Sequence, residues 1–382
     1  MPSSAPRHDC WIGYSDMRCD DPRGQFYNWT TTRAMVVRAD GSDRRELAAK
    51  LARKPNTWTQ FAGWSPDGRR AIVGSAWESP ENCAWEREHR EFRLTEGWLI
   101  DSCLVDLAGG KIENVTAVER VSDYNSGLFF WPNDPNRLGF TAIINGESRP
   151  YSMNLDGTGK RDLSTGAAGF TYGYSASPDG RRIAYHKSYQ VYLADADGGN
   201  AQAVVTGDPF HFGPLWSPDG KWLVFLAGTR GNCHLALVRA DGAGLRKLAD
   251  RGGYVGWVET LDTPDFHSAS SDVPTWSPDS RWIYYTATVG EAVELMRVSL
   301  EGKVEQLTHS LPGRSGGPAI QHYHPQVSPD GQWVVFGSTR DGARALYVAR
   351  ADGTEARPIT KPTPGRAHMH AQWQPAGLGE GR

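Results

Sequence analysis

The sequence has no apolar stretch long enough to cross a membrane and no excess of basic residues. No run approaches the roughly 18 apolar residues that a membrane span requires. The 41 Lys and Arg are outnumbered by 44 Asp and Glu, which gives a net charge of −3, whereas nucleic-acid-binding proteins usually carry a clear basic excess. We therefore expect neither a membrane span nor nucleic-acid binding.

Cysteine pairs with the spacing of a metal or redox site are also missing. The five cysteines are an odd number, and no two of them form a Cys-x-x-Cys motif. The first ten residues lack the basic-then-apolar pattern of a signal peptide. Scattered reduced thiols favour a cytoplasmic location, or a periplasmic or secreted one if a signal peptide has been removed. A P-loop, a GxGxxG after a strand and a GxSxG nucleophile elbow are likewise absent.

The sequence is rich, by contrast, in residues that form short strands and tight turns. Its 43 Gly and 24 Pro are too many for long helices, and aromatic residues make up 11% of the chain. Pro followed by Asp-Gly favours a tight turn, and flanking runs of Val, Ile, Trp, Tyr and Phe predict a hairpin. The motif Ser-Pro-Asp-Gly, or a close variant, begins at Ser65, Ser177, Ser217, Ser277 and Ser328.

The repeated unit is a strand, an SPDG turn, a strand, a loop, a third strand, a second turn and a fourth strand. A degenerate copy around Trp131 fills the long interval between Ser65 and Ser177, which makes six complete units. The N-terminal region carries only the second half of a unit and the C-terminal region, around Trp373, only a first half. Joining the two halves closes a ring and protects its edge strands. We therefore predict an all-β fold, a seven-bladed β-propeller whose closing blade is shared between the N- and C-termini. Residues 1–382 form one domain, with blades at 57–118, 124–165, 170–207, 210–250, 272–308, 322–360, and 10–48 plus 367–376.

Histidines concentrate at two positions of the predicted inner strands. The first strand of each blade lines the central channel, and residues two apart on a strand point the same way. Three blades have a histidine six residues before the turn, and two of these have another four residues before it. The two His-x-His pairs lie on adjacent blades. The five histidines are His211, His322, His324, His368 and His370.

Clustered imidazoles suit divalent transition metals such as Mn, Zn, Fe or Ni. We therefore predict that His322, His324, His368 and His370 converge on a metal ion; the alternative is that they bond to one another and to channel water. His211, farther round the ring, is a candidate general base because imidazole titrates near neutral pH. Its alternative is a solvated channel residue.

Other polar residues are expected at the channel. Gln60, Tyr124 and Asp272 are candidates for substrate binding. Tyr172 is a candidate proton donor or base, against the alternative of simple packing. Arg314 is a candidate partner for a substrate carboxylate, against the alternative of a solvated loop residue.

The stretch QHYHPQVSPDGQWVVFGSTRDGARALYVARADG, residues 321–353, resembles the final blade of oligogalacturonate lyases. The repeat as a whole resembles the TolB-like, WD-type propeller repeat. In those lyases an HPHP strand before an SPDG-like turn supplies two histidines to manganese, and His322 and His324 match that pair. The family's other ligands, a glutamine and a histidine, are replaced here by Ala319 and Val273, and His368 and His370 stand in a position to substitute for them. The lyase's base histidine has no match, so His211 or Tyr172 would take its role.

The resemblance implies a metal-assisted lyase, with manganese as the metal, that cleaves a uronic-acid-containing oligosaccharide or polysaccharide by β-elimination. The same parts would serve an epimerase or a hydrolase acting on a sugar or small metabolite. The other alternative is a non-catalytic TolB-like propeller that binds a protein or peptide. Two adjacent His-x-His pairs favour the lyase, because a protein-docking propeller has no need of them.

Overall fold

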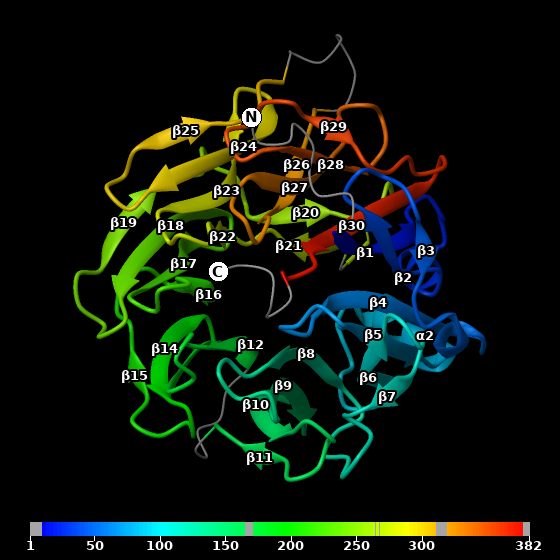
Figure 1. Cartoon of the computed structure of the whole chain (residues 1–382). Helices are drawn as coiled ribbons and strands as arrows, with labels where there is room; N and C mark the ends of the chain where they lie inside the picture. Colours follow the sequence, from blue (N-terminus) through cyan, green and yellow to red (C-terminus); the bar gives the residue numbers. More distant parts are fainter. Residues whose placement is uncertain (1–9, 165–170, 264, 267, 311–318, 377–382) are drawn as a thin grey trace.

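Seven four-stranded antiparallel sheets surround a central axis in the computed structural model of the chain (Figure 1). The structure describes residues 10–164, 171–263, 265, 266, 268–310 and 319–376. The predicted all-β, seven-bladed propeller is confirmed. A short hairpin, β20–β21, lies outside the blades. No helix in these residues is long and apolar enough to cross a membrane.

In blades 1 to 6 the four strands follow one another in chain order. Blades 1, 2 and 3 consist of β4 (Thr57–Trp64), β5 (Arg70–Glu78), β6 (Trp98–Asp106) and β7 (Ile112–Asn114); β8 (Asn125–Phe130), β9 (Arg137–Ile144), β10 (Glu147–Asn154) and β11 (Arg161–Asp162); and β12 (Thr171–Ala176), β13 (Arg182–Lys187), β14 (Gln190–Asp195) and β15 (Gln202–Ala203). Blades 4, 5 and 6 consist of β16 (Phe210–Trp216), β17 (Trp222–Thr229), β18 (Asn232–Arg239) and β19 (Arg246–Ala249); β22 (Thr275–Trp276), β23 (Trp282–Val289), β24 (Ala292–Ser299) and β25 (Val304–Gln306); and β26 (His322–Val327), β27 (Trp333–Ser338), β28 (Ala345–Arg350) and β29 (Arg357–Pro358).

Blade 7 joins the two ends of the chain, as predicted. The C-terminal strand β30 (Arg366–Trp373) pairs with β1 (Trp11–Arg18), which is followed outward by β2 (Arg33–Arg38) and β3 (Arg45–Glu46). The indole nitrogen of Trp373 donates to the carbonyl of Gln326 in blade 6, and that of Trp64 in blade 1 donates to the carbonyl of Gln372 in blade 7. Tryptophans before the turns therefore fasten the closing blade to both of its neighbours.

The SPDG motif forms the same hydrogen-bonded turn in every blade that carries it. In blade 1 the hydroxyl of Ser65 donates to Asp67 Oδ1 at 2.5 Å and accepts from the N–H of Arg70 at 2.9 Å. Gly68 has a φ of 66°, in the left-handed region that glycine tolerates best. The apolar faces of the sheets then pack blade against blade; one buried cluster, for example, joins Val224 of blade 4 to Ile283 of blade 5.

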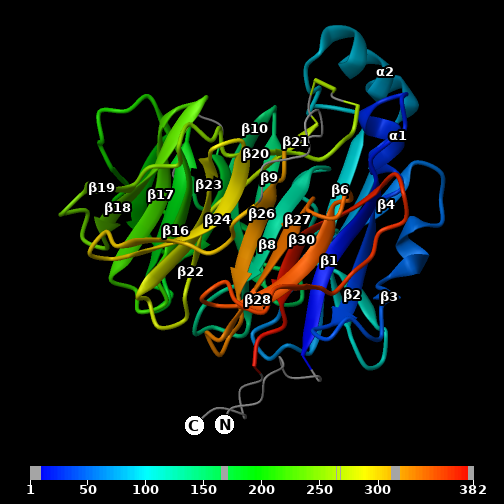
Figure 2. The same ribbon diagram turned by 90° about the horizontal axis from the view of Figure 1, so that it is seen from above.

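Insertions cover one end of the propeller, which we call the helix-bearing face (Figure 2). They are the segment with α1 (Gln25–Trp29), the segment with α2 (Pro80–His89) and the hairpin of β20 (Trp257–Glu259) and β21 (Ala269–Ser271). A short 3₁₀ helix, Ala49–Ala52, follows blade 7's outer strand. The hairpin segment begins between blades 4 and 5 but reaches blade 6, where Arg344 forms an ion pair with Asp262, and the α2 segment, where Phe92 contacts Phe266. It therefore extends over the inner strands of blades 6 and 7.

Candidate functional site

The inner strand of six blades carries a bulge near its middle, where the pairing with the second strand shifts. In five of these blades the residue four positions before the turn has a positive φ, and we call these five residues the inner rim. They are Gly127 (65°), Gly173 (69°), Gly213 (61°), His324 (50°) and His370 (55°). Because a bulge breaks the alternation of side chains along a strand, residues two apart no longer point the same way.

The histidines six positions before the turn consequently lie between blades, and the prediction that they line the channel is wrong. His211 is fully buried. Its Nδ1 lies 2.9 Å from Gln190 Nε2, and its Nε2 lies 2.5 Å from Thr206 Oγ1. A histidine in this position has no exposed nitrogen with which to act as a general base on a substrate.

His322 belongs to a second buried network, between blades 5 and 6. Its Nε2 lies 3.4 Å from Glu294 Oε2 and 3.2 Å from Ser310 Oγ. Burial works to raise the pKa of Glu294, but hydrogen bonds from His322, Thr308 and the N–H of Ser310 outweigh it and hold the pKa at about 2. The pair therefore joins two blades and faces away from the axis.

His368 belongs to a third network, between blades 6 and 7. Its Nδ1 lies 2.7 Å from Thr360 Oγ1, and its Nε2 lies 3.6 Å from Asp16 Oδ2. Asp16 also accepts hydrogen bonds from Arg44 and Arg366. His322 and His368 are thus held in separate networks, and the predicted convergence of four imidazoles is wrong.

Because these networks hold His322 and His368 apart, they bear on the predicted metal site. Nowhere in the described part of the chain do three His, Cys, Asp or Glu side chains gather in a way that would hold a metal ion. Two imidazoles are fewer ligands than a resident manganese ion takes, since Mn²⁺ prefers octahedral oxygen-rich sites. The residues present therefore do not fit the manganese centre that the resemblance implied.

His324 and His370, in contrast, lie together at the inner rim. Their ring centroids are 4.5 Å apart with an interplanar angle of 29°, so the imidazoles stack. The His324 side chain is 8% exposed, whereas His370 is exposed. These two of the four predicted ligands come from adjacent blades and are the ones that reach the axis.

A buried ion pair fixes the backbone of His324. Asp272 Oδ1 accepts the N–H of His324 at 3.0 Å, and Asp272 Oδ2 accepts the hydroxyls of Tyr254 and Thr286 at 3.1 and 2.5 Å. The guanidinium of Arg251 lies 3.9 Å from the same carboxylate, and both charged side chains are 1% exposed. Asp272, predicted to bind substrate, is therefore enclosed and supports His324 instead. Sequence reasoning missed Arg251, because a lone arginine before a Gly-Gly turn gives no sign of being buried.

The hairpin β20–β21 fixes the ring of His324. Its Nε2 lies 3.2 Å from Ser270 Oγ and 3.2 Å from the carbonyl oxygen of Ser271. A carbonyl only accepts, so we assign the ring proton to Nε2. Nδ1 then carries a lone pair, and it is buried without a hydrogen-bond partner among the described residues.

Both rim imidazoles are neutral at pH 7. Burial lowers the pKa of His324 to about 4. Desolvation by the surrounding side chains also lowers the pKa of His370. The neighbouring His324 lowers it further, because two adjacent charged rings would repel each other. The pair therefore offers donors and acceptors of hydrogen bonds without a positive charge.

The other predicted residues occupy varied places. Gln60 is exposed on the inner strand of blade 1. Tyr124 is half-buried, with its ring 5.8 Å from that of Trp98. Tyr172 lies in β12, but its side chain is outside the described part of the structure, and Arg314 lies outside the described residues altogether. Gln60 and Tyr124 thus remain candidates for contact with a ligand.

The repeated turns and the blade shared between the two ends of the chain define a seven-bladed β-propeller. Residues 102–324, more than half of the chain, match the family profile of the TolB β-propeller domain, PD40. The chain belongs to this family, and the sequence resemblance to TolB-like repeats is confirmed.

Individual relatives extend the comparison. An uncharacterized protein of Agrobacterium fabrum is 28% identical over 280 residues, which cover 72% of this chain and 82% of that protein. An uncharacterized peptidase of Bacillus subtilis is 26% identical over 200 residues, which cover 42% of this chain but only 28% of the peptidase. A solved oligogalacturonate lyase in complex with manganese has a TM-score of 0.55 at 14% identity, covering 87% of this chain and 84% of the lyase. At that identity the likeness is one of fold.

Proposed function

We propose that this propeller binds a carbohydrate at the inner rim, on the side formed by blades 6 and 7. The observation that carries the proposal is the placement of His324 and His370 in bulges where three other blades have glycine. A non-glycine residue at positive φ costs about 1–3 kcal/mol, and such strain clusters at ligand sites. The strain would serve to hold two imidazoles against the axis.

The chemistry of the pair suits hydroxyl groups. His370 is the exposed member of the pair, and it stacks on His324, whose Nδ1 is buried and has no hydrogen-bond partner among the described residues. Neutral imidazoles both donate and accept, as sugar hydroxyls do. Across the rim, no heavy atom of a described residue other than its chain neighbours lies within 4 Å of the position that a Cβ on Gly173 would occupy.

Binding to a panel of neutral and uronic-acid oligosaccharides, measured by isothermal titration calorimetry, tests the proposal. We expect saturable binding to the wild-type protein and a loss of about tenfold or more in affinity for His324→Gly/His370→Gly, because each buried hydrogen bond is worth roughly 0.5–1.5 kcal/mol. His89→Gln, at an exposed position on α2, is the matched control and should bind as the wild type does. If no oligosaccharide binds, or if both variants bind equally well, the proposal fails and docking of a protein or peptide becomes the better explanation.

A second candidate function is β-elimination on a bound uronide, with His370 as the base. The exposure of His370 at the inner rim favours this candidate, because its ring can reach a substrate there. Its lowered pKa makes it a weak base, so the reaction would be slow. The base would remove the proton from the carbon next to the carboxylate, a carbon–carbon double bond would form, and the glycosidic oxygen would leave and be protonated. Ultraviolet absorbance of an unsaturated product, lost in His370→Gly and His370→Gln, would support this reaction; binding without any absorbance change would exclude it for the sugars tested.

A further inference from the structure

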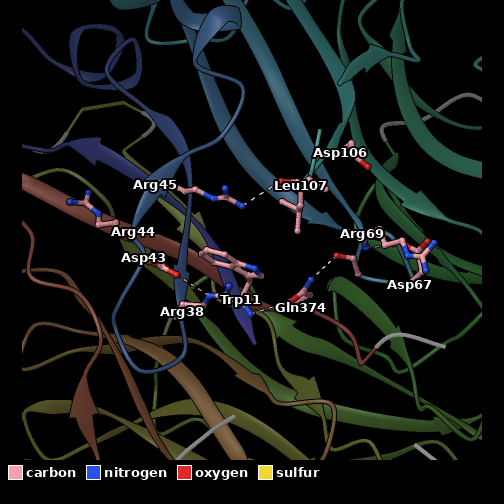
Figure 3. Close-up of a pocket in the computed structure, with 12 residues that line it drawn as sticks. Trp11, Arg38, Asp43, Arg44, Arg45, Asp67, Arg69, Asp106, Leu107 and Gln374 are labelled. Atoms are coloured by element: carbon pink, nitrogen blue, oxygen red, sulfur yellow. Dashed lines mark hydrogen bonds and ion pairs between the residues drawn. The ribbon is translucent and has the colours of Figure 1, made fainter. Parts of the chain in front are cut away.

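A groove with a volume of about 770 Å³ lies between blades 7 and 1, beside the SPDG turn of blade 1 (Figure 3). Neither His324 nor His370 lines it. Trp11 and Gln374 lie in it, and the two residues are joined by a hydrogen bond from the N–H of Trp11 to the Gln374 side chain. Its charged lining comes from both blades. The charged residues are Arg38, Asp43, Arg44, Arg45, Asp67, Arg69 and Asp106.

Two of the arginines in this blade 7–1 groove have no carboxylate partner in the described structure. Arg45 lies with its guanidinium 4.7 Å from the centre of the Trp11 ring and donates to the carbonyl of Leu107 at 3.5 Å. The side chain of Arg69 forms no hydrogen bond or ion pair with a described residue, and both arginines are exposed. Asp67 accepts from the Ser65 hydroxyl and the N–H of Arg69 within its own turn, and the nearby charges of Arg70 and Arg69 help to lower its pKa.

A second groove of about 670 Å³ occupies the equivalent place between blades 2 and 3. There Arg161 and Arg181 stand where Arg45 and Arg69 stand in the blade 7–1 groove. The turn after the third strand differs, however, because Asp197 takes the position of Ala108. Asp197 lies 3.9 Å from Arg161 and forms an exposed ion pair with it. The two turns also differ in length, since the N–H of Asp106 bonds to the carbonyl of Lys111 and that of Asp195 to the carbonyl of Gly199. The blade 2–3 groove thus gives its outer-strand arginine a carboxylate partner, and Arg45 forms no ion pair with a described carboxylate.

We propose that the blade 7–1 groove binds a phosphate-bearing small molecule through Arg45 and Arg69. Guanidinium groups form forked, charge-assisted hydrogen bonds that match phosphate oxygens. The volume is of the size that small-molecule ligands occupy. The phosphate replaces the carboxylate that Asp197 supplies in the blade 2–3 groove.

Isothermal titration calorimetry of the full chain with inorganic pyrophosphate tests this assignment. We expect one saturable site in the wild type, and affinity weakened by about tenfold or more in Arg45→Ala/Arg69→Ala and in Ala108→Asp, since charge-assisted hydrogen bonds are the strong ones. Ala108 is exposed, so its replacement leaves the packing intact. Arg161→Ala/Arg181→Ala, in the other groove, is the matched control and should bind as the wild type does.

Three results would overturn the assignment. They are the absence of saturable binding to the wild type, equal weakening in both double-arginine variants, and unchanged binding in Ala108→Asp. Thermal unfolding separates binding from folding: at one concentration, pyrophosphate should raise the Tm of the wild type and of the control by more than that of Ala108→Asp. Because the groove lies apart from His324 and His370, this outcome does not depend on whether the inner rim binds a sugar.

Discussion

The two sides of the inner rim place different residues at the same bulge, where the backbone has a positive φ. In blades 2, 3 and 4 the bulge holds glycine, which adopts a positive φ without strain, whereas in blades 6 and 7 it holds His324 and His370. On the histidine side, the buried carboxylate of Asp272 also accepts a hydrogen bond from the N–H of His324. Stability alone favours glycine at such a position, so the histidines point to a task other than folding. The comparison can be tested from either side.

The largest expected effect comes from removing the support of the histidine side. Asp272→Ala leaves the fully buried guanidinium of Arg251 without its carboxylate and removes the acceptor of the His324 N–H. Breaking one partner of a buried ion pair typically costs about 3–5 kcal/mol. We expect a loss of this size in the free energy of unfolding, measured by urea denaturation.

Asp262→Ala is the control for this measurement. Asp262 lies on the same hairpin segment as Asp272 and forms an ion pair with Arg344 of blade 6, but the Asp262 side chain is 49% exposed. Exposed pairs contribute about 0–1 kcal/mol, so this variant should unfold close to the wild type. An equal loss in the free energy of unfolding for the two variants would show that the Arg251–Asp272 pair stabilises the protein no more than the exposed pair does.

The next effect is a dependence of stability on pH to which His324, on the histidine side, contributes beside other buried histidines such as His186. The pKa of His324 is lowered from 6.5 to about 4, so between these values the unfolded chain binds a proton that the folded chain does not. The contribution of His324 to stability is therefore fully present above pH 6.5 and is lost as the pH falls toward about 4. The expected loss is about 3 kcal/mol, at 1.36 kcal/mol for each unit of pKa.

Replacing His324 by the residue of the glycine side tests the origin of that slope. His324→Gly should reduce the fall in the free energy of unfolding between pH 6.5 and 4, measured by urea denaturation at several pH values. The substitution also removes the backbone strain of a non-glycine residue at positive φ. His89→Gln should keep the slope of the wild type. A slope unchanged in His324→Gly would mean that other groups, such as the buried His322 and His368, produce it.

The sequence predicted the architecture because each blade repeats one turn whose chemistry is local. Ser65, Asp67 and Gly68 complete their hydrogen bonds within six residues, so the motif specifies the turn wherever it occurs. The half-blades at the two ends followed from the same pattern, with Trp373 marking the missing strand.

The site was predicted only in part, because its geometry depends on a bulge in the inner strand that the repeated sequence motif does not predict. Regular alternation would have brought His322 and His324 to the same face, but the extra residue turns His322 toward Glu294 and leaves His324 at the axis. The role of Asp272 depends on Arg251 and on the hairpin, which are distant in sequence from His324. Contacts of this kind are set by packing across blades, and no local pattern carries them.

The smallest expected effect tests the glycine side. Gly173→Ala places a Cβ at a φ of 69°, where no heavy atom of a described residue beyond its chain neighbours lies within 4 Å. The expected cost is therefore that of backbone strain, about 1–2 kcal/mol in urea denaturation. Gly213→Ala has a similar φ of 61° but brings its Cβ within 2.9 Å of Val273 Cγ1, so it should cost more than Gly173→Ala. A Gly173→Ala variant as stable as the wild type would mean that the bulge tolerates side chains freely. His324 and His370 would then carry no strain, and their presence at the rim would lose its weight as a sign of function.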